Sequence, residues 1–268
     1  MNLSIIIPTW NTALVTQKAI DSIKKHLKNI KYEIIVIDNG STDQTKNLLS
    51  SYKDVIYLRN KTNLGFSKAN NIAAKKASGE YLFFMNSDME LIDNSLTSML
   101  DYLKSHPKIG LIGPKFLNPN KTPQASVFPP QTPKNAFKEY FLRIKAYSKY
   151  LPFDQNPVSV WALSGGAILI SHKFFLQIGG WDESYFMYFE DLELCRTIRN
   201  LNKLIYYYPA CQIIHRHGFS GRKIADSANQ WRRLIPGSTL FHGLYQHRLI
   251  SLIIWSGQKL HHYWPFSK

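Results

Sequence analysis

Three short polar clusters in the first third of the chain each follow an apolar run. They are Thr9-Trp10-Asn11, Asp38-Asn39-Gly40 and Asn86-Ser87-Asp88. A carboxylate such as Asp38 can accept a hydrogen bond from the imide N–H that uracil and thymine carry; the alternative is that it caps the helix that follows. A carboxylate such as Asp88 can hold a divalent cation whose shell is completed by phosphate oxygens; the alternative is an ordinary Asx-type turn.

A second set of candidates lies in the last third of the chain. Glu190 and Asp191 begin a predicted helix, where the helix dipole favours carboxylates, directly after the aromatic stretch YFMYF. Apolar surroundings raise the basicity of a carboxylate, which suits Asp191 to general-base chemistry, although an acidic first turn is also common in purely structural helices. His215, with Arg222 a few residues on, suits contact with a diphosphate or its metal ion. A zinc site would need further ligands that the sequence does not offer.

These side chains need a framework that brings the ends of several strands together. Short apolar runs at 3–8, 32–38, 55–58 and 81–85 alternate with segments of helical periodicity at 12–27, 41–51 and 67–77. This alternation predicts parallel βαβ units and an α/β fold with a doubly wound sheet. Such sheets bind ligands at the carboxyl ends of their strands, where all three polar clusters lie.

The remaining segments are less regular. After a predicted helix over 95–104 and an extended run over 109–116, residues 118–157 hold seven prolines, which predicts a long basic loop. Further on we expect a strand within 161–171, a short helix near Phe174, a helix over 190–200, strands over 204–208 and up to His215, and a helix over 225–255.

Composition and charge bound the class of protein. With 268 residues, 44% hydrophobic and 19% charged, the chain can bury a large core, which excludes a disordered or fibrous protein. Its net charge of +15 is concentrated in residues 115–149, which carry +6, and residues 211–268, which carry +7. Neither segment has the dense basic run or the aromatic-basic motif of a nucleic-acid module, so we expect no nucleic acid as a partner.

The sequence also indicates a location. Two cysteines without a metal or redox spacing suggest a reducing compartment. The opening MNLSIIIPTW is typical of a first strand and not of a signal peptide, and no apolar run reaches the 18 residues of a membrane span. The basic C-terminal segment combines arginines with an apolar face, which suits an anionic membrane surface. We therefore expect a cytoplasmic protein, peripheral on the inner face of the plasma membrane.

Five segments carry a family resemblance. In chain order they are SIIIPTWN, YEIIVIDNGSTD, NLGFSKANNIAAKKASGEYLFFMNSD, SGGAILISHKFFLQIGGWDESYFMYFEDLELCRTIR and IIHRHGFSGR. Together they resemble family 2 glycosyltransferases of the GT-A fold, in particular the bacterial rhamnosyltransferase-like branch. The resemblance implies a Rossmann-like nucleotide-sugar-binding domain with a mixed central sheet over residues 1–222. Within it, 1–117 form the nucleotide-binding half, 118–157 the basic loop and 158–222 the acceptor and catalytic half; 223–268 form a helical extension.

The resemblance also implies roles for individual residues. Asp191 is the expected catalytic base, and Asp88, with His215, the expected holder of Mg²⁺ or Mn²⁺. On the acceptor side we expect Trp181, Asp182 and Glu190. The expected donor-site residues are Pro8, Thr9, Asn11, Asp38, Asn39, Asn63, Gly65, Asn70, Asn86, Ser87, Gly165, Gly166 and Arg222. Asn86 departs from the first Asp of the D-x-D motif of many members, which puts the metal affinity in question.

The expected reaction is transfer of a sugar, with inversion, from a nucleotide-diphosphate donor to a lipid-linked saccharide of a bacterial surface polysaccharide. The branch resembled favours dTDP-rhamnose, with a UDP-sugar as the alternative. A sugar-nucleotide pyrophosphorylase would need a glycine-rich basic loop after the first strand, where this chain has PTWNT. A non-catalytic basic module for membranes would leave Glu190-Asp191 and Asn86-Ser87-Asp88 without a role.

Overall fold

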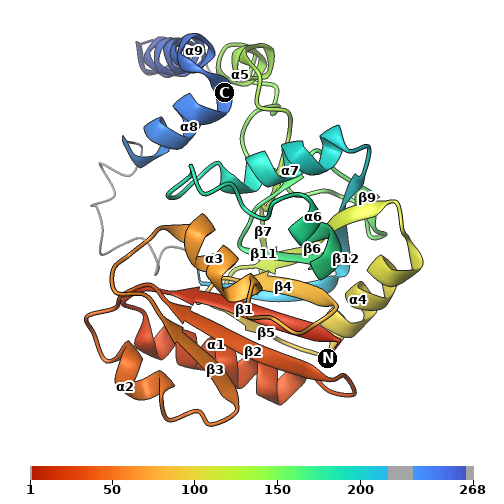
Figure 1. Ribbon diagram of the computed structural model, residues 1–268. Coiled ribbons are helices and arrows are strands. Elements are labelled where there is room, and N and C mark those ends of the chain that lie inside the picture. The colour runs from red at the N-terminus through yellow and green to blue at the C-terminus, as the bar shows by residue number, and fades with distance from the viewer. Residues whose placement is uncertain (1, 217–231, 264–268) are drawn as a thin grey trace.

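The computed structural model describes residues 2–216 and 232–263, so Arg222 lies outside the described residues (Figure 1). The helices are α1 (Ala13–His26), α2 (Thr45–Leu49), α3 (Phe66–Ala74), α4 (Ser95–Ser105), α5 (Pro133–Tyr140), α6 (His172–Gln177), α7 (Glu190–Asn200), α8 (Leu234–His242) and α9 (Leu244–Tyr263). The strands are β1 (Leu3–Thr9), β2 (Tyr32–Asp38), β3 (Val55–Arg59), β4 (Tyr81–Met85), β5 (Met89–Leu91), β6 (Ile109–Leu117), β7 (Pro123–Gln124), β8 (Val127–Phe128), β9 (Val158–Ser159), β10 (Ala162–Leu163), β11 (Ala167–Ser171) and β12 (Leu204–His215).

The central sheet has the strand order β3-β2-β1-β4-β11-β6-β12-β5. β1 is parallel to β2 and β4, and β2 is parallel to β3, as the βαβ alternation predicts. β11 runs antiparallel to both β4 and β6, and β5 runs antiparallel to β12. The sheet is therefore mixed, and the predicted α/β class is confirmed.

Apolar cores cover both faces of this sheet. Along β1, Ile5 and Ile7 belong to the core under α1 and α4, whereas Ile6 belongs to the core that α3 and α7 cover. Both faces of the strand are dry, which explains why its sequence is an uninterrupted apolar run and not an alternating one. Figure 1 shows the helices on the two sides of the sheet.

The prediction of a long loop over 118–157 was wrong in part, because this segment contains β7, β8 and α5. The start of α5 has clear chemical causes. The hydroxyl of Thr132 accepts the N–H of Asn135, and Pro133 stands in the first turn, where its missing N–H costs nothing.

Three other boundaries differ from expectation. The strands predicted over 204–208 and up to His215 are one continuous strand, β12. Its pairing with β6 shifts register between Tyr208 and Gln212, around Pro209. The short strand β5 has no signal in the sequence of its own and exists through pairing with β12. The helix predicted over 225–255 is divided, since Gly243 (φ +74°) separates α8 from α9. Residues 225–231 lie outside the described residues.

Helix α9 lies against α5, so the two basic segments meet in space (Figure 1). Gly257 makes the close approach: a methyl group in place of its hydrogen would lie 2.7 Å from the Cβ of Tyr140. Helix α8 contacts the body, where Phe241 packs on Phe189 and accepts a hydrogen bond from Arg196 at its carbonyl. None of the helices in the described ranges is long and apolar enough to cross a membrane.

Candidate functional site

The carboxyl ends of β1, β2 and β4 meet at one edge of the sheet and are joined by hydroxyl groups. Thr9 is buried at the end of β1, and its hydroxyl lies 2.9 Å from that of Thr12 and 2.7 Å from that of Thr16. The Thr12 hydroxyl continues the chain to Ser87, 3.1 Å away. Thr9 and Ser87 therefore belong to a buried chain of hydroxyl groups that connects the loop after β1 with the loop after β4. The half-buried Pro8 beside them is paired with β2.

Asn11 ties the loop after β1 to the loop after β2. Its backbone is left-handed (φ +54°), and its N–H donates to the hydroxyl of Ser41 at 2.8 Å. Its side-chain oxygen accepts the N–H groups of Thr42 at 2.8 Å and Asp43 at 3.3 Å. The predicted convergence of these two loops is thus present in the structure.

Asp38 is fully buried and its two carboxylate oxygens already have partners. Oδ1 accepts the N–H of Ser41 at 2.8 Å, and Oδ2 accepts the hydroxyl of Tyr57 at 2.5 Å. Arg59 Nε lies 3.5 Å from Oδ2. Asp38 thus closes the turn at Ser41, and it does not cap α2, whose N-cap residue is Gln44. Contact of Asp38 with an imide N–H stays a prediction.

Asn39 fastens the loop that leads to α3. Its side-chain N–H₂ donates to Asn63 Oδ1 at 2.8 Å and to the Gly65 carbonyl at 3.0 Å. Its side-chain oxygen accepts from Asn60 and from the N–H of Leu64, both at 3.0 Å. An amide that is almost entirely buried and makes four hydrogen bonds is a positioning element. Asn39 therefore shapes the expected donor loop from inside.

Gly65 connects this loop to the aromatic stretch before α7. Its φ is +86°, and a methyl group there would lie 2.6 Å from the carbonyl oxygen of Phe186. That carbonyl accepts the N–H of Phe66 at 2.7 Å. Asn70, one turn into α3, is fully buried and donates to the Phe66 carbonyl at 3.0 Å, and its contact with the donor stays a prediction. Within the described residues its side-chain oxygen has no hydrogen-bond partner.

Asp88 and His215 meet across β5 and β12, as expected from the metal hypothesis. His215 Nε2 lies 3.6 Å from Asp88 Oδ1, and the N–H of Arg216 donates to the Asp88 carbonyl at 2.8 Å. The other ring nitrogen of His215, Nδ1, is 2.6 Å from Oε1 of Gln124 on β7. An amide oxygen at Nδ1 favours the tautomer with the proton on Nδ1, so that the lone pair of the ring lies on Nε2, the nitrogen that faces Asp88. No third His, Cys, Asp or Glu joins these two as a metal-holding group within the described ranges.

Gly165 and Gly166 join the two halves of the site. The N–H of Gly165 donates to Asp191 Oδ2 at 3.0 Å, and the carbonyl of Gly166 accepts the N–H of Asn86 at 2.8 Å. A methyl group on Gly165 would lie 3.1 Å from the Asp191 Cβ, and one on Gly166 would lie 2.5 Å from the Met89 methyl. Both glycines therefore lie at positions of close approach to other parts of the chain. Two adjacent residues connect Asp191 with the turn that carries Asp88.

The two carboxylates at the start of α7 have different surroundings. Asp191 is half-buried, whereas Glu190 is 8% exposed, and Glu190 Oε2 has no hydrogen-bond partner among the described residues. Burial, reinforced by the neighbouring Asp191, raises the pKa of Glu190 to about 8. Tyr188 and Phe189 enter the helix in left-handed conformations (φ +71° and +70°), a strain typical of functional sites. At neutral pH Glu190 therefore holds its proton.

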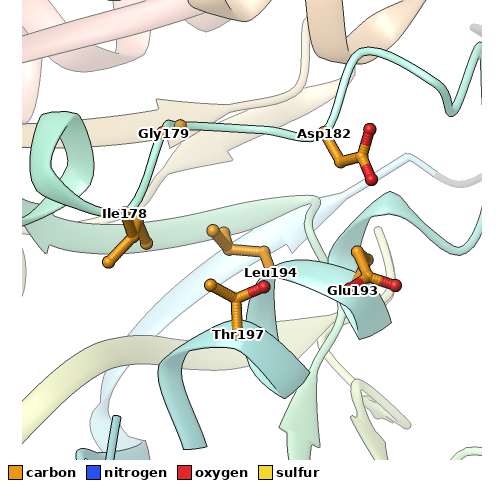
Figure 2. Close-up of a pocket in the computed structure, with 7 residues that line it drawn as sticks. Ile178, Gly179, Asp182, Glu193, Leu194 and Thr197 are labelled. Carbon is orange, nitrogen blue, oxygen red and sulfur yellow. The ribbon is translucent and has the colours of Figure 1, made fainter. Parts of the chain in front are cut away.

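The two other acceptor-side candidates lie elsewhere. Trp181 is 1% exposed and packs edge-on against Phe66 and Phe84, so its ring lies in the core, and its role on the acceptor side stays a prediction. Asp182 is exposed and lines a cavity of about 270 Å³ between its loop and α7. Figure 2 shows this cavity, which Asp182 lines from the loop and Glu193, Leu194 and Thr197 line from α7.

Sequence reasoning missed several residues that the structure places at the site. Tyr57 closes over Asp38, and Gln124 orients His215. Lys149, from the basic segment before β9, donates to the hydroxyl of Ser164 at 3.1 Å, next to Gly165. None of the three belongs to a motif, because each reaches the site from another strand or loop. Only the structure could reveal them.

Comparisons with known proteins agree with this geometry. Residues 4–170 match the family model described as glycosyl transferase family 2. The chain is 27% identical to the N-acetylglucosaminyl-diphospho-decaprenol L-rhamnosyltransferase of Mycobacterium tuberculosis over 213 residues. This aligned region covers 70% of this chain and 67% of that protein. It is 26% identical over 232 residues to the rhamnosyltransferase WbbL of Escherichia coli K12, covering 79% and 84%.

Solved structures show the same fold. GalNAc-T7, crystallised with UDP, GalNAc and Mn²⁺, superposes with a TM-score of 0.67 at 18% identity, over 92% of this chain and about half (49%) of that chain. Staphylococcus aureus TarS 1–349 superposes with a TM-score of 0.60 at 17% identity, over 98% and 72%.

Proposed function

The chain belongs to glycosyl transferase family 2, in its rhamnosyltransferase-like branch, and we propose that it moves L-rhamnose from dTDP-rhamnose to a hydroxyl group of a lipid-linked saccharide, with inversion at the anomeric carbon. The observation that carries this proposal is the link through Gly165 and Gly166, which fixes Asp191 and the Asp88 turn on one rigid frame. Inverting displacement needs a proton acceptor and a leaving-group site held in a fixed relation.

Asp191 supplies the proton acceptor in this mechanism. The acceptor oxygen forms a bond to the anomeric carbon while the bond from that carbon to the diphosphate oxygen breaks. The hydroxyl proton goes to a carboxylate oxygen of Asp191, and the electron pair of the broken bond leaves with the nucleoside diphosphate. The Gly165 N–H, 3.0 Å from Oδ2, orients the carboxylate during this transfer. Glu190, with its proton retained, adds no second negative charge.

Asp88 and His215 are the residues that would hold a divalent cation. They fit this role because a carboxylate and an oriented imidazole lie 3.6 Å apart, and Mg²⁺ or Mn²⁺ usually takes only a few protein ligands beside substrate phosphates. When bound, such a cation stabilises the charge that develops on the departing diphosphate. The GalNAc-T7 structure contains Mn²⁺, which supports a metal in this fold. Asn86, in place of an acid, leaves Asp88 as the carboxylate of its turn.

The donor hypothesis is tested by thermal shift with a panel of dTDP-rhamnose, dTDP-glucose, UDP-GlcNAc and GDP-mannose. We expect dTDP-rhamnose to stabilise the protein most. UDP-GlcNAc is the informative rival, because TarS has been solved with that donor. Stabilisation by UDP-GlcNAc alone would overturn the rhamnose assignment, and stabilisation by none of the four would overturn donor binding itself.

The transfer step is tested with Asp191→Asn. The acceptor in the assay is N-acetylglucosamine on farnesyl diphosphate, chosen because the mycobacterial relative is named for N-acetylglucosaminyl-diphospho-decaprenol. We expect a loss of turnover of about 10²- to 10⁴-fold with donor binding retained, since a general base contributes about that much. The exposed Asp101 of α4 gives a matched control, Asp101→Asn, which should keep wild-type turnover. Equal turnover of the Asp191 variant and the wild type would remove Asp191 from the mechanism.

We also propose that the protein docks on an anionic membrane through α5 and α9. These helices pack together and expose Phe137, Leu252 and Trp255 at 45%, 59% and 60%. The exposed Lys134 and Arg248 lie on the same two helices. An apolar surface with cations beside it binds anionic headgroups at about 1 kcal/mol for each nearby Lys or Arg. A lipid-linked acceptor would then lie in the same membrane as the enzyme.

Vesicle sedimentation tests this docking. The protein should sediment with phosphatidylglycerol vesicles at low salt and much less with phosphatidylcholine vesicles. The double variant Leu252→Ser with Trp255→Ser should lose most of this binding, whereas Leu14→Ser, at a residue of α1 that is 68% exposed, should not. Equal sedimentation with both lipids, or an unaffected double variant, would overturn the proposal.

A further inference from the structure

Lys149 is a half-buried ammonium group next to the proposed reaction site. Its Nζ donates to the hydroxyl of Ser164 at 3.1 Å and lies 4.7 Å from the ring centre of Phe128. Ser164 directly precedes Gly165, whose N–H holds the Asp191 carboxylate. The residue that contacts the Lys149 ammonium is therefore the direct neighbour of the residue that holds the Asp191 carboxylate.

Within the described residues, no carboxylate lies close enough to Lys149 to form an ion pair with it. The ion pairs formed by other lysines are on the surface, such as Lys24 with Asp54 at 2.6 Å. Burial lowers the pKa of Lys149, and the more distant Asp191 and Glu190 act in the opposite direction. A cation withdrawn from water without a counter-ion is unfavourable unless a ligand supplies the negative charge.

The backbone around Lys149 is firmly held. The carboxylate of Glu139 accepts the N–H groups of Ala146, Tyr147 and Ser148 at 2.8, 2.6 and 3.0 Å, which fixes the turn just before the lysine. On the other side, the backbone of Tyr150 exchanges two hydrogen bonds with that of Val127, at 2.8 and 3.2 Å. The ammonium therefore has a defined position, as a binding group needs.

The same segment connects Lys149 to the helices that carry the exposed apolar side chains. Glu139 belongs to α5, and its neighbour Tyr140 is the residue on which Gly257 of α9 packs. The chain thus passes from α5 through the turn held by Glu139 to Lys149, beside Ser164 and Gly165. Lys149 therefore lies on the stretch of chain that joins these helices to the residue next to Gly165.

We infer that Lys149 binds a phosphate group of the substrate, and that this phosphate belongs to the lipid-linked acceptor. The inference rests on the proposed function and specifies its acceptor site. Both substrates of that reaction carry phosphate, but Asp88 and His215 already provide a place for the donor diphosphate. Lys149 instead contacts Ser164, next to Gly165, whose N–H holds the proton acceptor of the incoming hydroxyl. A positioned lysine can bind a phosphate without a further partner. Its ammonium group is a compact positive charge, and the N–H groups that Ser164 does not use can donate to phosphate oxygens.

The test compares Lys149→Met and Lys149→Arg with Lys145→Met, a matched control at an exposed lysine of the same segment. Each variant is assayed with N-acetylglucosamine on farnesyl diphosphate and with neutral octyl N-acetylglucosaminide. We expect Lys149→Met to raise KM for the diphosphate acceptor about 10- to 100-fold, the usual cost of losing a charge-assisted contact, and to leave KM for the neutral acceptor unchanged. Lys149→Arg should recover most of the difference, and Lys145→Met should match the wild type.

Two further measurements separate the possible failures. Calorimetric titration of dTDP-rhamnose without an acceptor should give the same Kd for Lys149→Met and wild type; a weaker Kd would assign the phosphate to the donor and overturn the inference. An equal fall of kcat with both acceptors would mean that the lysine acts through Asp191, which would also overturn it. Titration of farnesyl diphosphate into wild type and Lys149→Met needs no turnover, and equal affinity there refutes the inference even if the proposed transfer fails.

Discussion

The protonated state of Glu190 makes stability depend on pH in a way that can be measured. The pKa of Glu190 is about 8 in the folded protein, against 4.5 for its ordinary value, because the side chain is buried beside Asp191. Between these two pH values the folded protein keeps a proton that the unfolded chain has lost. The contribution of the protonated Glu190 to the free energy of unfolding is therefore complete below pH 4.5 and is lost as the pH rises toward 8.

The magnitude follows from the size of this window. One proton difference changes the free energy of unfolding by about 1.4 kcal/mol for each pH unit, or about 4 kcal/mol between pH 5 and pH 8. In a chain of this length that corresponds to a fall in Tm of about 10 °C. Glu190→Gln keeps the shape of the neutral acid and has no proton to lose, so its stability should not fall in this way.

The assay is thermal unfolding of the wild type and Glu190→Gln at half-unit steps from pH 5 to pH 8.5. We expect the wild type to lose stability relative to the variant steadily above pH 5, and the variant to be the more stable protein at pH 8.5. Glu80→Gln, at an exposed glutamate, serves as the control and should keep the wild-type slope. Parallel Tm curves for wild type and Glu190→Gln would refute the assignment of a neutral buried Glu190.

Other changes have equally direct consequences. Asn39→Ala removes four hydrogen bonds of a buried amide and should lower the free energy of unfolding by about 2–4 kcal/mol in urea titrations; a loss below about 0.5 kcal/mol would contradict its positioning role. Gly65→Ala puts a methyl group 2.6 Å from the Phe186 carbonyl at φ +86°, so Tm should fall and dTDP-rhamnose should bind more weakly, and unchanged binding would separate this loop from the donor site. Asp88→Asn should raise the Mn²⁺ concentration for half-maximal activity at least about 10-fold, and EDTA should abolish wild-type activity; full activity in EDTA would exclude the metal role of Asp88 and His215.

Much of the strand framework could be predicted because its signals are local. The run YEIIVID coincides with β2, and the acidic start of α7 coincides with its first turn at Glu190. A close backbone approach at Gly165 has a local signal, because glycine within a strand pattern is typical of one, but nothing local identifies Asp191 as its partner. The antiparallel direction of β11 has no local signal. It entered through the family resemblance, and a βαβ pattern alone predicts parallel strands.

The roles of single side chains were harder to predict, because burial depends on what packs from elsewhere. Asp38 stands at the predicted strand end, yet Tyr57 of the next strand covers one of its oxygens. Trp181 follows two glycines in a motif that suggests an exposed loop, yet Phe66 and Phe84 enclose its ring. Both outcomes are decided by the register of neighbouring elements, which no motif records.

The sequence by itself determined the fold class, the family and the placement of the polar clusters at the ends of strands, since hydrophobic period and motif spacing act over a few residues. Only the tertiary structure decided which polar groups face one another. It placed His215 beside Asp88 and joined Asp191 to the Asp88 turn through two glycines. It also placed Lys149, from a segment predicted as a loop, against Ser164. The physical reason is that side-chain charge, hydrogen bonding and desolvation depend on distances of a few ångströms between residues far apart in the chain.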